Sequence, residues 1–281
     1  MTAGLCAVVL AAGEGRRLRP LTAIRPKALC PVGNVPLLDR AFAALRELGL
    51  DGPETVAVNA HWLAGQVLSH VDGRGYVSVE PDHPLGTAGG LGKLRDWIAG
   101  RPVLVVNADA YHSGPGFGPG LLDGWDGATV RLLGIPTKPD DPYRFGDHRF
   151  AGASVLPWAY VAPLAAEPAE LVHEVWRPAE RAGRLRVVEY PGGYLDTGTP
   201  AGYLAANLDA AGGTSLVAPD AVVTGRLDRA VVGAAAVVHG VVTRGVVWPG
   251  GYVGSGEHLV GAIRVGRDLT VLADLGSQAP A

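Results

Sequence analysis

The sequence contains few cysteines and little charge of either sign. Cys6 and Cys30 are the two cysteines among 281 residues. Neither belongs to a pair with metal-ligand spacing, so we expect reduced thiols in the core. The formal net charge is -3, which lacks the basic excess that nucleic-acid-binding proteins usually carry. We therefore expect no nucleic-acid partner.

Long apolar runs are also absent. No apolar stretch approaches the length of a transmembrane helix, about 18 residues or more. Met1 leads directly into a strand pattern, without the charged and apolar regions of a signal peptide. These features predict a cytoplasmic protein with no membrane partner. Because 48% of its residues are hydrophobic, the chain can still bury a sizeable core.

Short apolar runs alternate with helical patterns through the first three quarters of the chain. The runs are LCAVVL, TVAVNA, YVSVE, PVLVVNAD and ATVRLLGI. Between the first two, PLLDRAFAALRELG carries one apolar helical stripe that Gly49 closes. This alternation predicts an α/β domain with a mostly parallel sheet over residues 1–212. We expect a loop in GPGFGPG, residues 114–120.

The pattern changes from residue 213 onward. Four hexads that begin with valine, VAPDAV, VGAAAV, VWPGGY and VGRDLT, start at residues 217, 232, 247 and 265. A turn with three six-residue faces takes about 18 residues, and the starts lie 15, 15 and 18 residues apart. The spacing predicts a short left-handed parallel β-helix over residues 213–281, and the alternative is an irregular β appendage.

A glycine turn with clustered positive charge follows the first apolar run, in LAAGEGRRLRPLTAIRPKAL, residues 10–29. Backbone amides freed by glycines beside arginine and lysine suit a polyphosphate. A dinucleotide fingerprint is excluded because Leu18 occupies the third glycine position, and a Walker A motif because Ala28 follows Lys27. The pattern favours a turn whose amides meet a nucleotide, with Arg17 and Lys27 on its phosphates.

Seven segments resemble those of the sugar-1-phosphate nucleotidyltransferases, the nucleotide-sugar pyrophosphorylases, and most of all the mannose-1-phosphate guanylyltransferase-like members. In family order they are VVLAAGEGRRLRPLTAIRPKALCPV, VNAH, LGTAGGL, VVNAD, FAGASVL, YLDTGTP and the terminal hexads. The resemblance implies a Rossmann-like nucleotidyltransferase domain with a β-helix tail, in the EC 2.7.7 class. A sugar-1-phosphate oxygen would attack the α-phosphorus of a nucleoside triphosphate, releasing pyrophosphate and forming a GDP-mannose-like product.

The resemblance also implies roles for individual residues. Catalysis would depend on Arg17 at the leaving pyrophosphate, Lys27 near the α-phosphate and Asp109. Asn107 and Gly152 would contact the sugar. The nucleotide would be bound by Leu10, Ala11, Ala12, Gly13, Glu14, Gly15, Glu80, Gly86 and Thr87, the last two in the LGTAGG turn, whose small residues permit close approach to base and sugar.

Two aspartates are the candidate metal ligands. Asp109 ends an apolar strand, and Asp196 precedes the TGTP turn. Two such carboxylates could share one Mg²⁺ that bridges the phosphates. A helix cap or a turn is the alternative role for each aspartate taken alone, and their match to family positions favours the metal.

Recognition of the base and of the sugar phosphate is less determined. Glu80 could accept hydrogen bonds from guanine, or it could be an ordinary exposed glutamate at a strand end, so guanine is favoured only weakly over uracil or thymine. Ala108 stands where the family usually has glycine. The family's Glu-Lys-Pro segment has no counterpart in PYRFGDHRF. Candidates to replace its lysine are Lys138, Arg144 and Arg149.

Several features leave a second interpretation open. The altered sugar-phosphate segment also fits a non-catalytic regulatory or sensor subunit that binds nucleotide sugars. We expect surface roles for Arg16 and Arg19 and structural or solvent roles for His61 and His239. The tail is too short for the acyltransferase that some relatives carry, so we expect it to serve regulation or homo-oligomer assembly.

Overall fold

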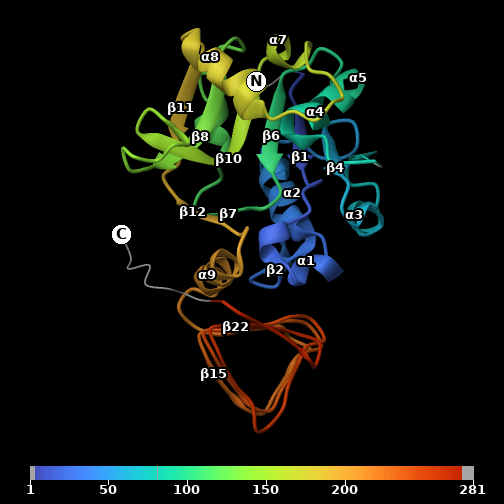
Figure 1. Ribbon diagram of the computed structural model, residues 1–281, viewed down its shortest axis with the longest axis vertical. Coiled ribbons are helices and arrows are strands. Elements are labelled where there is room, and N and C mark those ends of the chain that lie inside the picture. Colours follow the sequence, from blue (N-terminus) through green and yellow to red (C-terminus); the bar gives the residue numbers. More distant parts are fainter. Residues whose placement is uncertain (1–3, 81, 274–281) are drawn as a thin grey trace. The chain divides into compact units, whose positions relative to one another are not determined.

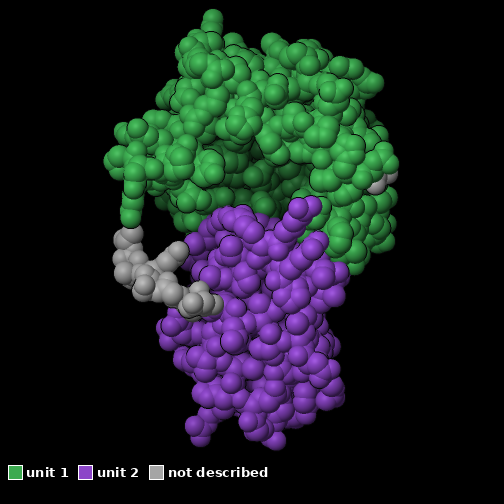
Figure 2. Space-filling model, viewed as in Figure 1, with its two compact units in different colours: residues 1–14, 38–194 green, residues 15–37, 195–281 purple. Residues whose placement is uncertain are grey.

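The computed structural model describes residues 4–80 and 82–273, which form two compact units (Figure 2). Of the described residues, the first unit contains those up to Glu14 and from Leu38 to Tyr194. The second contains Gly15–Leu37 and the described residues from Leu195 onward. Within the described ranges, every helix is too short or too polar to cross a membrane.

An eight-stranded sheet forms the centre of the first unit, in the order β11-β8-β10-β6-β1-β4-β5 with β9 paired to β10 (Figure 1). All pairs are parallel except those that β10 makes with β6, β8 and β9. The mostly parallel sheet that the sequence predicts is confirmed. The strands are β1 (Cys6–Leu10), β4 (Val56–Ala60), β5 (Tyr76–Val79), β6 (Val103–Asn107), β8 (Val130–Pro136), β9 (Arg144–Phe145), β10 (His148–Leu156) and β11 (Leu185–Glu189).

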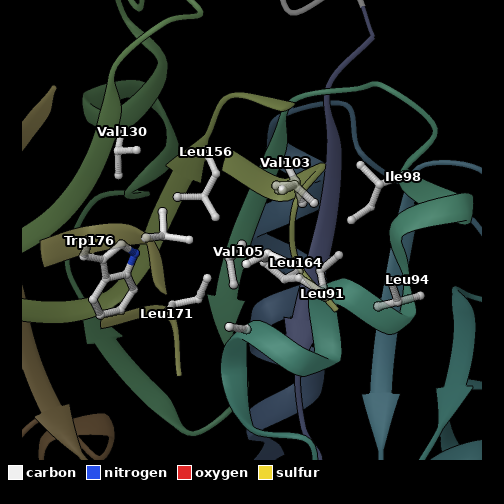
Figure 3. Close-up of a cluster of buried hydrophobic side chains, with 14 of the residues drawn as sticks. Leu91, Leu94, Ile98, Val103, Val105, Val130, Leu156, Leu164, Leu171 and Trp176 are labelled. Atoms are coloured by element: carbon white, nitrogen blue, oxygen red, sulfur yellow. The ribbon is translucent and has the colours of Figure 1, made fainter. Parts of the chain in front are cut away.

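Helices cover the sheet and explain its continuous apolar strands. Leu91, Leu94 and Ile98 pack with Val103 and Val105 of β6 in a buried cluster that extends to the π-helical turn at Val172–Trp176 (Figure 3). Strands β1, β4 and β6 are buried almost throughout, as in parallel sheets covered on both faces. The helices are α2 (Leu37–Glu47), α3 (Ala64–Val71), α4 (Gly86–Lys93), α5 (Arg95–Ile98), α6 (Gly118–Leu122), α7 (Trp158–Val161) and α8 (Arg177–Arg181).

The loop predicted for residues 114–120 is wrong in its last part. Helix α6 begins at Gly118, and this short helix buries Leu121 completely. Tertiary burial of one leucine therefore outweighs the low helix propensity of glycine and proline in this segment.

The order of the strands marks one end of the sheet for ligand binding. From β1 the chain proceeds to β4 and β5, and then returns to β6 on the other side of β1. In α/β sheets, ligands bind at the carboxyl ends of the strands where the order reverses in this way. Here those ends carry Leu10 and Asn107, which are partners in the β1–β6 ladder. The topology therefore predicts a site at the residues that follow these two strands.

Short elements of the signature segment pack with the tail in the second unit. They are η1 (Arg16–Leu18), α1 (Leu21–Ile24), η2 (Lys27–Leu29) and the hairpin β2 (Pro31–Val32) and β3 (Val35–Pro36). The Gly33 amide donates to Asn207 Oδ1 (3.0 Å) in α9 (Pro200–Ala210), and Asn34 Nδ2 donates to the Val232 carbonyl (3.0 Å). The compact units therefore divide the chain differently from the boundary expected at residue 213.

The tail is a parallel β-helix, as predicted, and its three-sided coil is seen end-on in Figure 1. Successive turns are offset by 15 residues, as in Leu216 with Val231, and later by 17, as in Val246 with Ile263. Small and β-branched residues fill its interior. The three sides comprise β13 (Leu216–Val217), β16 (Val231–Val232), β19 (Val246–Val247) and β22 (Ala262–Val265); β14 (Val222–Val223), β17 (Val237–Val238) and β20 (Tyr252–Val253); and β15 (Arg226–Asp228), β18 (Val241–Thr243) and β21 (His258–Val260).

The fourth hexad, VGRDLT, does not add a further turn to the coil. Its residues form a hairpin instead, because β23 (Leu269–Leu272) pairs antiparallel with β22. Gly266 has a φ of +58° at this reversal, a conformation that glycine adopts without strain.

Candidate active site

The nucleotide loop, residues 10–15, begins at the carboxyl end of β1. The Ala11 amide donates to Asn59 Oδ1 of β4 (2.7 Å), and Ala11 and Ala12 are buried. Gly13 is exposed, and a Cβ atom there would meet no other atom within 4 Å. The loop thus passes from anchored, buried backbone to open backbone at Gly13, an arrangement that suits contact with a phosphate.

Gly15 fixes the turn at the start of the second unit. Its φ is +61°, and a Cβ atom would lie 2.7 Å from Thr22 Cγ2. The Thr22 hydroxyl donates to the Gly15 carbonyl (2.8 Å). Since the left-handed conformation and the close threonine both disfavour a side chain, glycine is required here. The turn sets the position of Arg17 in η1.

Two cations and a carboxylate meet above the TGTP turn in the second unit. Arg17 Nη2 and Lys27 Nζ each lie 3.5 Å from one oxygen of Asp196, and the Gly198 amide donates to Asp196 Oδ1 (2.8 Å). The Lys27 side chain is 9% exposed and that of Arg17 is 69% exposed. Lys27 is therefore a fixed charge, whereas Arg17 has its guanidinium in solvent, where it can meet an anion.

This charge cluster keeps Asp196 ionised. Burial acts to raise the pKa of Asp196, but Lys27, the Gly198 amide and Arg17 outweigh it and lower the pKa below its usual value. The two cations and one carboxylate leave a local excess of positive charge. Such an excess favours a polyphosphate.

Gly198 leaves no room for a side chain beneath the cluster. A Cβ atom would lie 2.8 Å from both Arg17 Nη2 and Asp196 Oδ1 and 3.2 Å from Lys27 Nζ. We expect Gly198→Ala to separate the charged groups and to lower kcat by about 10- to 100-fold, since displacements near 1 Å have effects of this size. The measurement is steady-state pyrophosphate release.

Gly65→Ala is the matched control for this substitution. A Cβ atom at Gly65 would meet no atom within 4 Å, and the residue lies in α3. It should leave turnover unchanged and stabilise the helix slightly. Normal kcat in Gly198→Ala would show that the geometry of the cluster does not matter for turnover.

The carboxyl end of β6 carries the other predicted aspartate. Asn107 closes the strand, the buried Ala108 donates its amide to the Leu10 carbonyl (3.0 Å), and Asp109 follows, half-buried. This bond joins the ends of β1 and β6 at the reversal of strand order. Asp109 therefore lies at the edge where the topology predicts ligand binding.

The available carboxylates suit a metal that also binds water and substrate phosphates, as Mg²⁺ does, more than a metal bound by protein ligands alone. Within residues 4–80 and 82–273 there is no group of three or more His, Cys, Asp or Glu that could hold a metal. Mg²⁺ commonly takes one or two carboxylates, with waters and substrate phosphates completing its octahedron. The sequence predicts two carboxylate ligands, Asp109 and Asp196, a number within that range.

The structure places Glu80 inside the protein, where it does not face a base. The residue is 1% exposed, Oε1 accepts from Asn59 Nδ2 (2.9 Å), and Oε2 accepts from the Leu85 amide (2.8 Å). This burial argues against the expected contact with guanine, because the side chain is covered by protein and each of its oxygens accepts from a protein donor. Sequence analysis missed Asn59, whose signal is a polar residue inside the apolar run TVAVNA.

The glycines of LGTAGG are required for packing within the protein. In α4, Cβ atoms at Gly86 and Gly89 would collide with the carbonyls of Ala169 and Glu167, in a segment that lies across the helix. The Thr87 hydroxyl donates to Glu170 Oε2 (2.6 Å) and accepts from the Leu171 amide. Close approach to base and sugar, the reason expected for these small residues, is thus not needed to explain them.

Gly152 likewise has a reason internal to the first unit. It lies at a register shift between β10 and β8 with a φ of +81°, and a Cβ atom would lie 2.5 Å from Ala110 Cβ in β7 (Ala110–Ser113). Tyr194, in β12 (Gly193–Asp196), is also close to this position. The structure therefore explains the glycine without a sugar contact.

The three candidates for the sugar phosphate lie on or next to one hairpin. Arg144 of β9 and Arg149 of β10 are cross-strand partners, Lys138 precedes them, and all three are exposed. Like charges opposite each other destabilise a hairpin slightly. An anion bound between the two arginines would relieve that repulsion.

The remaining predicted residues occupy the surroundings expected for them. Arg16 and Arg19 are exposed. His61 Nδ1 lies 2.5 Å from the Glu80 carbonyl, and His239 Nδ1 lies 2.7 Å from Thr224 Oγ1. Both histidines thus have hydrogen-bond partners within the protein.

A small pocket of about 190 Å³ lies in the first unit beside β6. It is lined by Asn107 together with Arg40, His112 and Tyr190. Burial lowers the pKa of both Arg40 and His112. Of the predicted site residues, the pocket includes Asn107, which connects it to the carboxyl end of β6.

The chain is similar in sequence to known sugar-1-phosphate nucleotidyltransferases. N-acetylmuramate alpha-1-phosphate uridylyltransferase of Neisseria meningitidis is 38% identical over 109 residues, covering 37% of this chain and 46% of that protein. Probable mannose-1-phosphate guanylyltransferase 2 of Arabidopsis thaliana is 26% identical over 231 residues, covering 70% and 63%. The chain thus spans less than two thirds of these two relatives. The uridylyltransferase of Caulobacter vibrioides is 29% identical over 237 residues, covering 71% and 94%.

A solved structure shares the fold. A Bacillus anthracis protein assigned as a glucose-1-phosphate thymidylyltransferase aligns with a TM-score of 0.59 and 17% identity, covering 73% of this chain and 95% of that one. The resemblance to sugar-1-phosphate nucleotidyltransferases is confirmed. The model of the MobA-like NTP transferase domain matches residues 7–190, and the chain therefore belongs to the MobA-like NTP transferase family.

Proposed function

We propose that the protein transfers a nucleoside monophosphate from a nucleoside triphosphate to a sugar-1-phosphate. A sugar-phosphate oxygen forms a bond to the α-phosphorus, the bond from that phosphorus to the bridging oxygen of the β-phosphate breaks, and pyrophosphate leaves with both electrons. The product is a nucleotide-diphospho-sugar. The observation that carries this proposal is the cluster of Arg17, Lys27 and Asp196, in which two cations each lie 3.5 Å from an oxygen of one carboxylate.

Each residue has a defined task in this reaction. The nucleotide loop holds the nucleotide through its backbone amides. Lys27 neutralises charge near the α-phosphate, and Arg17 stabilises the departing pyrophosphate. Asp109 and Asp196 would hold Mg²⁺, which when bound lowers the negative charge that faces the attacking oxygen. No covalent enzyme intermediate is needed, so rate acceleration comes from positioning and charge neutralisation.

The choice of base and sugar is what the substrate grid below measures. The relatives described above include guanylyl-, uridylyl- and thymidylyltransferases, and Glu80 is occupied by protein donors. Arg144 and Arg149 supply the positive charge that we assign to the sugar phosphate. We place the enzyme in the cytoplasm and give the β-helix a role in regulation or homo-oligomer assembly.

A sensor that binds nucleotide sugars without turnover is the second candidate. The missing Glu-Lys-Pro segment favours it, because that segment carries the family's sugar-phosphate lysine. The presence of Asp109 and of the charge cluster argues against it, since binding alone does not require paired metal carboxylates.

Pyrophosphate release over a grid of substrates decides between the two candidates. The grid combines GTP, UTP and dTTP with the 1-phosphates of mannose, glucose and N-acetylmuramate, each with and without Mg²⁺. We expect release with at least one pair, abolished by EDTA and restored by Mg²⁺. Binding of a nucleotide sugar by calorimetry without pyrophosphate release from any pair would favour the sensor.

A further inference from the structure

Glu80, Asn59 and Ala11 form one buried chain of hydrogen bonds at the ends of β5, β4 and β1. The Ala11 amide donates to Asn59 Oδ1 (2.7 Å), Asn59 Nδ2 donates to Glu80 Oε1 (2.9 Å), and the Leu85 amide donates to Glu80 Oε2 (2.8 Å). Asn59 and Glu80 are 2% and 1% exposed. The chain links the first residue after β1 to the turn before α4.

The direction of every bond in this chain is determined by its two ends. A backbone amide can only donate, so Ala11 requires the oxygen of Asn59, which turns the Asn59 amino group toward residue 80. Leu85 also donates to residue 80. Residue 80 must therefore accept from two donors on two separate oxygens, and a carboxylate satisfies both. A glutamine at position 80 would turn its own amino group toward either Asn59 Nδ2 or the Leu85 amide, so that two donors would face each other.

Helix α4 covers the side chains of this hydrogen-bond chain, so that a ligand cannot contact them. A Cβ atom at Gly90 would lie 2.7 Å from Asn59 Nδ2 and 3.2 Å from Glu80 Oε1. The helix backbone therefore packs directly on these two side chains. A carboxylate covered in this way acts through its neighbours.

We propose that Glu80 is a positioning residue that orients the nucleotide loop through Asn59. This inference rests on the proposed function of that loop. By holding the Asn59 amide in one orientation, Glu80 fixes the Ala11 amide and with it the direction in which residues 12–14 leave β1. Loss of the relay should weaken binding of every nucleotide to the same degree, because no base is contacted.

The test swaps the amide of Asn59 and the carboxylate of Glu80 between the two positions. Glu80→Gln breaks one link, and Asn59→Asp sets two carboxylates against each other. In the double variant Asn59→Asp/Glu80→Gln, Asp accepts from Ala11 and from the Gln amino group, and Gln accepts from Leu85. All the hydrogen bonds and the net charge are restored. We expect each single variant to weaken nucleotide affinity about 10-fold or more, the size expected for a buried unsatisfied donor, and the double variant to return within about 3-fold.

Affinity for GTP, UTP and dTTP is measured by calorimetry, hydrogen exchange is measured on the peptide that contains Ala11, and folding is checked by thermal unfolding. We expect faster exchange in the single variants and its reversal in the double variant. A changed ratio of GTP to UTP affinity in Glu80→Gln, or a double variant no better than the single ones, would overturn the proposal. So would a double variant with restored unfolding temperature and exchange but weak nucleotide binding.

Failure of the proposed function has a different signature. In that case the unmodified protein binds none of the three nucleotides. Hydrogen exchange at Ala11 and its rescue in the double variant still report whether the relay orders this backbone, so exchange that stays fast in the double variant overturns the relay independently.

Discussion

Replacing Asp109 or Asp196 with asparagine is expected to lower kcat by about 100-fold or more, which corresponds to about 3 kcal/mol of transition-state stabilisation. A metal that bridges reacting phosphates contributes most in the transition state. The loss should therefore appear in kcat more than in the KM for the nucleotide. Steady-state pyrophosphate release at saturating Mg²⁺ measures both constants.

The double variant distinguishes a shared ion from two separate roles. If Asp109 and Asp196 hold one Mg²⁺, removing both should cost much less than the sum of the two single losses, because the second ligand has no ion left to hold. Asp220→Asn, at an exposed turn of the β-helix, is the control and should turn over normally. Losses that add fully would show that the aspartates do not share a metal.

Trp248→Ala is expected to destabilise the second unit by about 3–5 kcal/mol, the range measured for large aromatic residues removed from cores. Trp248 is 2% exposed, its indole N–H donates to Tyr203 Oη (2.9 Å), and the Arg25 guanidinium lies 4.9 Å from its ring centre. Tyr203 Oη in turn donates to the Pro31 carbonyl. The tryptophan thus anchors the segment that carries Lys27 to the β-helix.

Thermal and urea unfolding measure this effect, and turnover should fall with it because Lys27 loses its support. Trp248→Phe keeps an aromatic ring and loses the hydrogen bond, so we expect a smaller loss, about 1 kcal/mol. Val260→Ala, at a position 55% exposed on the same β-helix, should be neutral. An unchanged unfolding curve for Trp248→Ala would mean that the β-helix does not stabilise the signature segment.

The sequence alone predicted the elements whose signal is local. Apolar runs such as LCAVVL and TVAVNA identified β1 and β4 because buried parallel strands need continuous hydrophobicity. Valine hexads revealed the β-helix for the same reason, since its interior repeats with each turn. The prediction that the fourth hexad adds a turn to the β-helix is wrong, because the hexad pattern is the same at the start of a hairpin and of a further turn. Whether the next strand pairs parallel or antiparallel depends on the path of the chain after the hexad.

The candidate site was predictable where chemistry is tied to residue type. Arg17 and Lys27 follow a glycine turn, and Asp196 precedes another, so their charges could be identified from spacing and family resemblance. That they meet at one carboxylate, 3.5 Å from each cation, could not be predicted, because Asp196 comes 169 residues after Lys27 and 179 after Arg17 in the chain.

What the sequence by itself determined is the class of the protein: an α/β nucleotidyltransferase domain with a β-helix. It also supplied the candidate phosphate-binding residues. These follow from local periodicity and from short motifs. The tertiary structure decided which groups Glu80 contacts, why LGTAGG is rich in glycine, and which unit the segment 15–37 belongs to. Each of those depends on a partner distant in sequence: Asn59 for Glu80, residues 165–170 for α4, and the β-helix for residues 15–37. Packing between such partners produces no local sequence pattern from which it could be predicted.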